Sequence, residues 1–483
     1  MSSEEIAFLS AAELLEAYGK RELSPVEVTK VTLERIDRLN PKLNAYLTID
    51  HEGALAAAEE AERAWAQPGE RPLLCGVPIS IKDLILTSWL PTTFGSLAFK
   101  DYYPPHNAPV VDRVRAAGAI VLGKTNTPEF GLIDSTQNRL AGDGRNPWNL
   151  DHTCGGSSGG AGAAVAAGLG PLAIGTDGAG SIRNPALYNG IFGLKPTFGR
   201  IAHDGWKGAP YTSHQGPMTR TVRDAALIMQ VASGPDERDP LCMREAPPDF
   251  LEALEPGTLR GTKVALSLDY GYIDPDPETR QAVLDASDLL RGLGCEIIES
   301  HPPRQERPST LVGDTTGPDE YAWALRLKPD IAEHFDDLTN YGRGIIESGM
   351  AVPAWKYSAA VRRREAWAAA VHRWFADYDF LLAPVMALTA PRIDEERRLE
   401  GRPWPGAFLP VFNASGSPAA SVPFGFHSNG LPLAVQIAGR SGDDVGVLRM
   451  CAAVEAARPW AGNWPAIATE PATAREPDRA RGS

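Results

Sequence analysis

The chain has 483 residues, of which 43% are apolar and 22% are charged, and its formal net charge is −14. A chain of this length can bury most of its apolar surface, so it needs no disulfides or structural metals to fold. The acidic balance argues against a surface that binds nucleic acid or anionic membranes, because such surfaces are rich in Lys and Arg.

Other features of the sequence bear on compartment. The first ten residues, MSSEEIAFLS, lack the basic segment and apolar run of a secretion signal. No apolar run approaches the length of about 18 residues that a transmembrane helix needs. The five cysteines are odd in number and have no Cys-x-x-Cys spacing, which argues against a disulfide framework or a zinc site. We expect a cytoplasmic monomer or homodimer.

Residues 1–70 are expected to be helical. Ser24 can cap a helix in which Pro25 takes the first position and Glu27 completes a capping box. A second helical run, rich in Ala and Glu, extends from Ala54 to Ala66.

Helix and strand signals alternate from residue 71 to residue 235. Val77–Ile81 alternates like a strand, Val110–Ala117 has helical spacing, and Ile120–Leu122 is a short buried strand. Glycine is dense between residues 155 and 200, and strand-like segments flank it, so we interpret the glycines as permitting close backbone contacts. The alternation predicts an α/β fold.

Residues 236–375 differ, because they carry many charges and prolines before a long helical stretch, Trp355–Phe375. We interpret them as an insertion that covers one edge of the sheet. Strand signals then return at Phe380–Leu382, Ala420–Val422 and Leu433–Val435, followed by a helix over Val445–Ala456. The polar stretch after about residue 467 is expected to be disordered.

Separated motifs carry the strongest functional signal. They are Ile81-Lys82-Asp83, Gly155-Gly156-Ser157-Ser158-Gly159-Gly160 and Gly175-Thr176-Asp177-Gly178-Ala179-Gly180-Ser181-Ile182-Arg183. Others are Gly123-Lys124-Thr125-Asn126, Asn146-Pro147-Trp148-Asn149, residues 190–197 and Asn413-Ala414-Ser415-Gly416-Ser417-Pro418-Ala419. In this order they resemble the amidase signature family, over roughly residues 74–456.

The resemblance implies a single amidase domain over residues 1–483, a three-layer α/β/α fold with a large mixed β-sheet. It implies amide hydrolysis with no cofactor and no metal. The expected parts are a helical part at 1–70, a catalytic core with the motifs at 71–235, a variable insertion covering the active site at 236–375, a C-terminal core part at 376–466 and a disordered tail at 467–483.

In this family one serine attacks the amide carbonyl, and a second serine, preceded by a cis peptide bond, bridges it to a lysine. By resemblance, Ser181 is the nucleophile, Ser157 the bridging serine and Lys82 the base. The chemistry agrees, because a serine hydroxyl attacks only after a base removes its proton. A lysine can be that base only when burial keeps it neutral, and Lys82 follows an apolar strand.

The loop before the nucleophile is expected to form an oxyanion hole. The donors would be the backbone N–H groups of Gly178, Ala179, Gly180 and Ser181. Each donor of this kind typically stabilises the transition state by about 3–4 kcal/mol. Many family members have two glycines before the nucleophile, whereas this chain has Ala179-Gly180, and the methyl group narrows the space beside the reacting carbonyl.

Three further residues are expected to support the site. Asp177 and Arg183 flank the nucleophile loop, and we expect them to form a structural ion pair that holds it. Ser158 follows the bridging serine directly and is the third supporting residue.

Ser157 has an alternative interpretation as the nucleophile of a Ser-His-Asp α/β-hydrolase. Residues 155–159 match the Gly-x-Ser-x-Gly elbow, which must directly follow a buried strand. Here the preceding residues 145–151 are polar and broken by proline, and His427 lies in an apparent hairpin turn. The sequence has no His-Glu-x-x-His motif, so no metal site is expected.

A second alternative is the glutamine-hydrolysing subunit of a tRNA-dependent amidotransferase, which belongs to the same family and acts only with partners. That subunit typically carries an arginine just before an Ile-x-x-Gly stretch, for the substrate carboxylate. The nearest match here, residues 344–349, does not fit that pattern.

The expected substrate is a small linear amide. Several aromatic residues near the motifs are candidates for an apolar pocket: Trp89, Phe94, Tyr188, Trp206 and Tyr211. They favour aryl or hydrophobic acyl amides, with carbamates (urethanes) and esters following the same acyl-transfer path.

Overall fold

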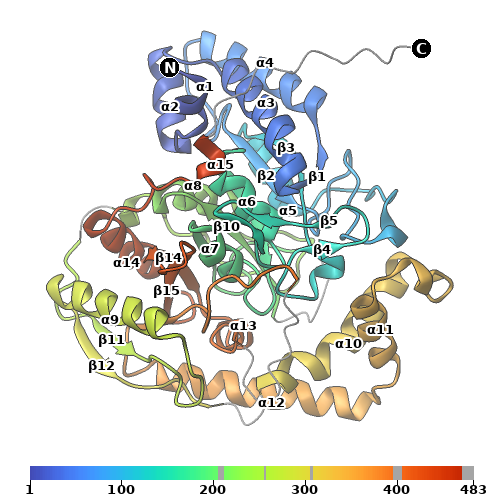
Figure 1. Cartoon of the computed structure of the whole chain (residues 1–483), viewed down its shortest axis with the longest axis vertical. Helices are drawn as coiled ribbons and strands as arrows, with labels where there is room; N and C mark the ends of the chain where they lie inside the picture. The colour runs from blue at the N-terminus through green and yellow to red at the C-terminus, as the bar shows by residue number, and fades with distance from the viewer. Residues whose placement is uncertain (205–211, 255–256, 305–307, 395–404, 470–483) are drawn as a thin grey trace.

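The computed structural model describes residues 1–204, 212–254, 257–304, 308–394 and 405–469. One mixed sheet of 11 strands forms its centre (Figure 1). Its strands are β1 (Tyr46–Ile49), β2 (Pro78–Lys82), β3 (Ile120–Thr125), β8 (Leu172–Asp177), β9 (Phe192–Lys195), β10 (His214–Thr219), β11 (Lys263–Leu266), β12 (Glu296–Glu299), β13 (Phe380–Pro384), β14 (Ala419–Phe426) and β15 (Pro432–Gly439). Two small sheets pair β4 (Gln137–Asn138) with β5 (Gly142–Asp143), and β6 (Arg145–Asn146) with β7 (Asn149–Thr153).

The order of the strands determines where the candidate site residues at the strand ends lie. Along the sheet it is β1-β3-β2-β8-β10-β9-β14-β15-β13-β11-β12. β2 and β8 are parallel neighbours, with Ile81 opposite Ile174. Their carboxyl ends, which carry Lys82 and Asp177, therefore emerge at the same edge of the sheet.

The helices connect these strands. They are α1 (Ser3–Ala7), α2 (Ala11–Lys20), α3 (Pro25–Leu43), α4 (His51–Ala66), α5 (Pro109–Ala116), α6 (Gly159–Ala166), α7 (Arg183–Asn189), α8 (Val222–Ala232), α9 (Pro277–Gly292), α10 (Pro308–Leu327), α11 (Asn340–Met350), α12 (Ala354–Trp374), α13 (Pro410–Ala414), α14 (Asp444–Ala457) and α15 (Ala466–Thr469). Short 3-10 turns are η1 (Leu97–Phe99), η2 (Glu129–Gly131), η3 (Glu252–Leu254) and η4 (Ile331–Asp337).

Helices pack on both faces of the sheet. One face is covered by α5, α8, α9 and α14, whose apolar side chains join the largest core cluster with side chains from the strands. The opposite face is covered by α3, α4, α6, α7 and α12, through smaller clusters. This arrangement confirms the expected α/β class and its three layers.

Local sequence accounts for the start of α3 and the composition of α6. The Ser24 hydroxyl accepts the N–H of Glu27 at 3.1 Å, and Pro25 takes the first turn. In α6, a Cβ on Gly160 would lie 2.4 Å from the backbone nitrogen of Asn126. The run of small residues therefore lets α6 approach the neighbouring backbone closely.

Residues 236–375 were expected to cover one edge of the sheet, but they also form part of it. They contribute β11 and β12, which extend it to its last strand, together with α9. The remainder forms α10, α11 and α12, which lie together along the lower part of Figure 1. We call α10, η4, α11 and α12 the helical lobe. The long helix expected at Trp355–Phe375 is present as α12.

The C-terminal stretch remains ordered slightly longer than expected. Ile467 and Ala468 are buried in α15, and Arg35 donates to the Ala468 carbonyl at 2.9 Å. Tertiary packing on α3 thus holds the first residues of the expected tail, and residues 470–483 lie outside the described residues.

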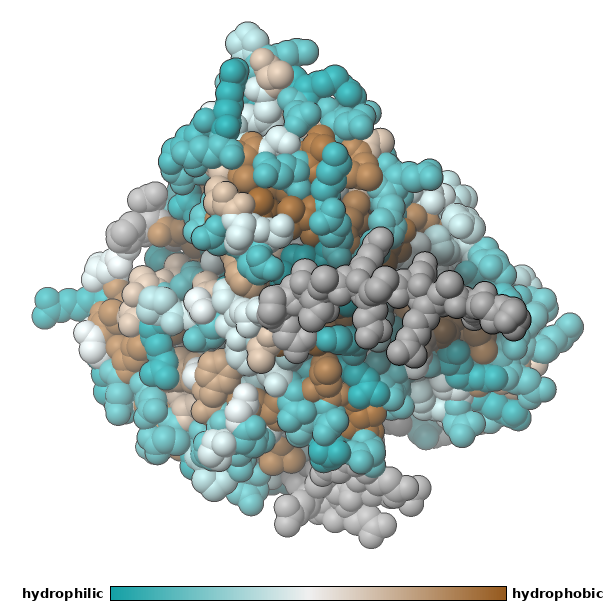
Figure 2. Space-filling view, turned by 45° about the horizontal axis from the view of Figure 1, so that its top comes forward, coloured by the Kyte–Doolittle hydropathy of each residue, from teal (hydrophilic) through white to brown (hydrophobic). Residues whose placement is uncertain are grey.

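The surface in Figure 2 is largely hydrophilic, with hydrophobic residues in separate patches between polar ones. Within the part of the chain that the structure describes, no helix combines the length and the apolar character required to cross a membrane.

Candidate active site

Lys82 ends the buried strand β2, and its side chain is fully buried. Its Nζ lies 2.7 Å from Ser157 Oγ, 2.9 Å from Ser158 Oγ and 2.8 Å from Thr176 Oγ1. A buried amine is therefore placed among hydroxyl groups, one of which belongs to the expected bridging serine. Such an arrangement can pass a proton between a hydroxyl and the amine.

A second buried lysine fixes the backbone just after Lys82. Asp83 accepts the Thr93 N–H, and Lys124 Nζ lies 3.5 Å from its Oδ1. Burial raises the pKa of the Asp83 carboxyl against the opposing effect of Lys124. Burial also lowers the pKa of the Lys124 ammonium to about 8, although Asp83 opposes this shift. The pair holds the residues after β2 in place.

Ser157 is buried in the loop between β7 and α6, and the Gly156–Ser157 peptide bond is cis, as the resemblance implied. Gly131 lies against this serine: a Cβ there would lie 3.0 Å from Ser157 Oγ. Ser157 is thus enclosed between Lys82 and the backbone of residue 131.

Ser181 lies in the turn between β8 and α7 and is only half-buried. Its carbonyl accepts the N–H of Ser158 at 3.1 Å. This contact brings the backbone of Ser181 beside the Ser157-Ser158 segment. The structure therefore gathers Lys82, Ser157 and Ser181 in one place, although they are far apart in sequence.

The loop at residues 178–181 has one donor already in use. The Gly180 N–H donates to Asp177 Oδ1 at 2.6 Å, so it points at that carboxylate and away from a substrate oxygen. This differs from the expectation for Gly180, because the aspartate that precedes the loop folds back beneath it. Gly178, Ala179 and Ser181 stay the predicted donors of the oxyanion hole.

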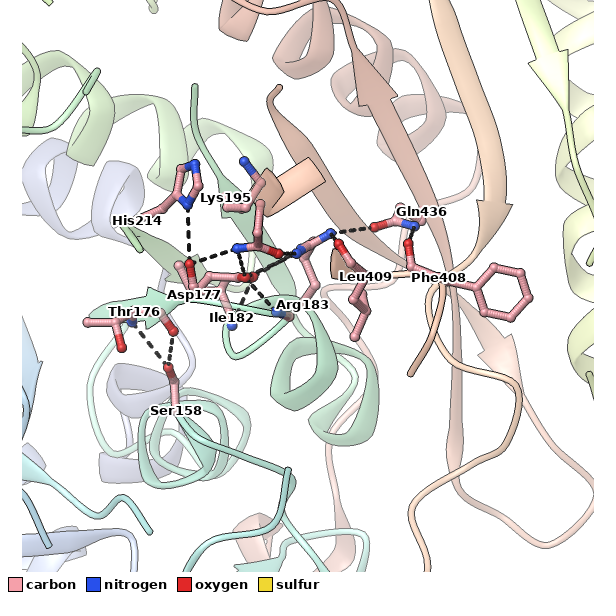
Figure 3. Close-up of polar contacts among 12 residues, drawn as sticks. Ser158, Thr176, Asp177, Ile182, Arg183, Lys195, His214, Phe408, Leu409 and Gln436 are labelled. Carbon is pink, nitrogen blue, oxygen red and sulfur yellow. Dashed lines mark hydrogen bonds and ion pairs between the residues drawn. The ribbon is translucent and has the colours of Figure 1, made fainter. Parts of the chain in front are cut away.

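Asp177 and Arg183 form the ion pair expected from the sequence, and both are fully buried (Figure 3). Arg183 also donates to Gln436 Oε1 at 2.8 Å and to Asn413 Oδ1 at 2.6 Å. Burial alone would raise the pKa of the Asp177 carboxyl, but the Arg183 charge and hydrogen bonds, with Lys195 and Asn413, hold it well below its usual range.

Lys195 and His214 lie beside this pair, above it in the view of Figure 3. Burial, reinforced by the Arg183 charge, lowers the pKa of Lys195 well below its usual value. Burial and Lys195 together lower the pKa of His214. The His214 Nδ1 lies 2.8 Å from the Thr212 carbonyl oxygen, so its hydrogen is directed at backbone.

Three residues of the site were not selected from the sequence. Thr176 lies within the motif Gly175–Arg183, and Asn413 lies within the motif Asn413–Ala419. Both residues therefore had a signal in the sequence. Gln436 had none, because only the pairing of distant strands brings it to Arg183.

The context of a nucleophile elbow is missing around Ser157. The preceding strand, β7, alternates between exposed and partly buried residues and pairs with the short strand β6 and, through His152, with Arg392, outside the large sheet. His427 lies in the turn between β14 and β15, with its Nε2 3.3 Å from Glu278 Oε1. Among the described residues, no group of three or more His, Cys, Asp or Glu side chains is placed to hold a metal ion.

The structure does not bring together, in one pocket, the candidate aromatics that it describes. Phe94 is buried in a cluster with Phe99, Phe130 and Trp323, and Tyr188 is buried in another. Trp89 stacks under Arg115 and donates to Asp50. Trp206 and Tyr211 lie outside the described residues.

The fold and the site define a hydrolase of amide bonds, and comparison with known proteins agrees. The Amidase family model matches residues 27–448, and the chain belongs to this family. It is 37% identical to an acylamidase of Rhodococcus erythropolis, over 96% of this chain and 99% of that protein. It is also 35% identical to a glutamyl-tRNA(Gln) amidotransferase subunit of Roseiflexus sp. (strain RS-1), over 96% of this chain and 99% of that one.

Among solved structures, a bacterial aryl acylamidase of the amidase signature family superposes with a TM-score of 0.89 at 32% identity. The match covers 96% of this chain and 99% of that one. The chain is thus similar over nearly its full length to an acylamidase, to an aryl acylamidase and to a subunit of an amidotransferase.

Proposed function

We propose that the protein hydrolyses linear amides through an acyl-enzyme on Ser181, with Ser157 and Lys82 as its proton relay. The observation that carries the proposal is the 2.7 Å contact between the fully buried Lys82 amine and Ser157 Oγ, beside the backbone of Ser181. A base that acts through a hydroxyl needs such a contact.

In the proposed reaction, neutral Lys82 takes the Ser157 proton as Ser157 takes the proton of Ser181. The Ser181 oxygen attacks the amide carbonyl, and the N–H groups of Gly178, Ala179 and Ser181 stabilise the resulting oxyanion. The relay returns the proton to the nitrogen, so that the C–N bond breaks and the amine leaves. Water then attacks the ester by the same route, releasing the acid and restoring the enzyme.

We propose aryl or hydrophobic acyl amides as substrates, with carbamates and esters as further acyl donors. The similarity to an acylamidase and to an aryl acylamidase supports this choice. The half-buried position of Ser181 supports a small substrate that reaches the nucleophile from the surface.

A panel of chromogenic anilides, carbamates and esters tests the proposal, with the Ser181→Ala variant as control. We expect hydrolysis of at least one anilide and an acyl adduct on Ser181 by mass spectrometry. Hydrolysis that persists in the Ser181→Ala variant would reject Ser181 as the nucleophile. Light scattering on the same sample tests the expectation of a monomer or homodimer.

The second candidate is a glutamine-hydrolysing component of an amidotransferase, favoured by the similarity to the Roseiflexus protein. On α11, the guanidinium of Arg343 is bound to Glu347, with Nε 2.8 Å from Oε1, instead of being free for a substrate carboxylate. Glutaminase activity of the isolated chain, measured with and without partner proteins, separates the two candidates. Glutamine hydrolysis that occurs only with partners would favour the second.

A further inference from the structure

A loop on the far side of Ser157 from Lys82 touches the segment that carries this serine. We call residues 129–137 the flanking loop. Gly131 approaches Ser157 Oγ, as described above. A Cβ on Gly156 would lie 2.7 Å from the Ile133 carbonyl oxygen, and Thr136 Oγ1 donates to the Gly155 carbonyl at 2.8 Å. The flanking loop therefore fixes where the Ser157 hydroxyl lies.

The first turn of α11 holds this loop at both ends. The Tyr341 hydroxyl accepts the N–H of Glu129 at 2.8 Å and donates to the Gln137 carbonyl at 2.8 Å. One phenol oxygen thus closes the flanking loop across its two ends. Tyr341 lies 212 residues from Glu129 in sequence, so this closure depends on the helical lobe being in place.

The buried side chain of Glu129 also binds the first turn of α11. The Glu129 side chain is fully buried, and its Oε2 accepts the Thr339 N–H at 2.7 Å and the Thr339 hydroxyl at 2.5 Å. A Cβ on Gly342 would lie 2.1 Å from that oxygen, so the carboxylate occupies the space that a side chain would need. The N-terminus of a helix favours a negative charge at this place.

Aromatic side chains also pack the helical lobe against the flanking loop, through α10. Trp323 of α10 meets Phe94 and Phe130 edge to face, with ring centroids 4.8 Å and 5.5 Å apart. The Phe130 N–H donates to the Phe94 carbonyl at 2.7 Å. The flanking loop is therefore enclosed between α10 and α11.

We propose that Tyr341 is a positioning residue for the hydrolysis: by closing the flanking loop, its hydroxyl keeps Ser157 at hydrogen-bond distance from Lys82. This inference rests on the proposed function, because it assumes that Ser157 relays the proton. Tyr341 acts through Glu129 and Gln137. Displacements of about 1 Å in a reacting constellation cost up to about a hundredfold in rate, so the loss of this closure acts on the chemical step.

The test compares two tyrosines of the same lobe. Tyr341→Phe removes the hydroxyl that closes the flanking loop. Tyr357→Phe removes a hydroxyl that donates to Asp319 Oδ1 at 2.8 Å, between α12 and α10. The two variants lose the same atom, and only one loses contact with the flanking loop. A second pair, Thr339→Val and Thr339→Ser, removes or keeps the hydroxyl that binds Glu129.

Turnover of a small anilide is measured per active site, with sites titrated by a small serine-directed sulfonyl fluoride. We expect Tyr341→Phe to lower kcat and the sulfonylation rate constant by about tenfold or more, with KM within about twofold of wild type. Tyr357→Phe is expected to keep kcat, whatever its effect on Tm. Thr339→Val is expected to lower kcat in the same way, and Thr339→Ser to restore it.

Other outcomes overturn the inference. They are an unchanged kcat per titrated site in Tyr341→Phe, an effect confined to KM, or equal losses of kcat in the two tyrosine variants. If Tyr341→Phe does not fold, equal kcat in Thr339→Val and Thr339→Ser overturns it instead. A wild-type enzyme that hydrolyses no amide and is not sulfonylated at Ser181 overturns the proposed function as well, whereas the other outcomes leave that function standing.

Discussion

Arg183 binds both carboxylate oxygens of Asp177, with its Nε 3.0 Å from Oδ2 and its Nη2 3.0 Å from Oδ1. The same carboxylate accepts the N–H groups of Gly180 and Ile182, on either side of Ser181. The ion pair therefore holds the turn of Ser181 from inside the protein, at a place that water does not reach.

Replacing Asp177 with Asn should leave the Arg183 charge buried without its counter-charge. We expect the free energy of unfolding to fall by about 3–5 kcal/mol, as for other broken buried pairs. Urea unfolding measures this. Asp288→Asn is the control, because Asp288 pairs with Arg291 at the solvent-exposed surface, where such pairs contribute about 1 kcal/mol or less. Equal losses in both variants would contradict the special role of the buried pair.

Stability should also fall in acid because of this pair. The pKa of Asp177 is lower in the folded than in the unfolded chain, since Arg183 outweighs the effect of burial. The unfolded chain therefore binds more protons, and this contribution is complete above the unfolded pKa of about 4. It is lost as pH falls below that value toward the folded pKa. The decline should be shallower in Asp177→Asn, measured by urea unfolding between neutral and acid pH, and an equally steep decline would contradict the assignment.

Gly180→Ala should disturb the nucleophile loop. Gly180 has φ of 123°, and a Cβ there would lie 2.3 Å from Leu409 Cδ1. We expect a loss of about 1–3 kcal/mol in unfolding free energy from the strain and the crowding, with loss of turnover. Gly178→Ala is the control for stability, since its Cβ would meet nothing within 4 Å. A Gly180→Ala variant as stable as Gly178→Ala would show that the loop can move aside.

Variants of the proposed triad should lose activity in a set order. Ser181→Ala removes the attacking atom, so turnover should fall to background. Lys82→Ala should be nearly as severe, whereas Ser157→Ala should keep more residual activity, because a water molecule can replace a bridging hydroxyl. Since the residues act as a unit, the double variant Ser157→Ala/Lys82→Ala should be little worse than Lys82→Ala. Substantial turnover in Ser181→Ala with none in Ser157→Ala would exchange the two serine roles.

Histidine should not be needed for the chemistry. His427 is held beside Glu278 in a turn, and His152 Nδ1 lies 2.7 Å from the Ala390 carbonyl oxygen. We expect His427→Ala and His152→Ala to keep turnover within a few-fold of wild type, measured on the best anilide. A loss of about 10³-fold or more in a folded variant would support a Ser-His-Asp mechanism instead.

The sequence predicts where the candidate site lies, because its glycine-rich motifs lie at the ends of strongly apolar strands. Lys82 could be placed after an apolar strand from the sequence, and the parallel pairing of β2 and β8 then brings the end of β2 beside Asp177. The use of the Gly180 N–H could not be predicted, since it depends on how the Asp177 side chain turns back under the loop.

Contacts between residues far apart in the chain could not be predicted from the sequence, for a different reason. Gln436 reaches Arg183 across 253 residues, and only the order of strands in the sheet brings it there. The strands β11 and β12 were also missed within residues 236–375. Each has four residues, and in β12 the outer two are exposed glutamates, so neither shows a clear alternation.

The reach of Asn413 and Gln436 to Arg183 has a consequence for synthesis of the chain. Ser181, the proposed nucleophile, is translated early, but the two side-chain amides that hold its supporting arginine arrive more than 200 residues later. A nascent chain released from the ribosome only as far as residue 400 has both serines and the lysine, yet leaves the Arg183 guanidinium without three of its acceptors, the Leu409 carbonyl, Asn413 and Gln436. The support of the turn at Ser181 is therefore complete only when the last strands of the chain have joined the sheet.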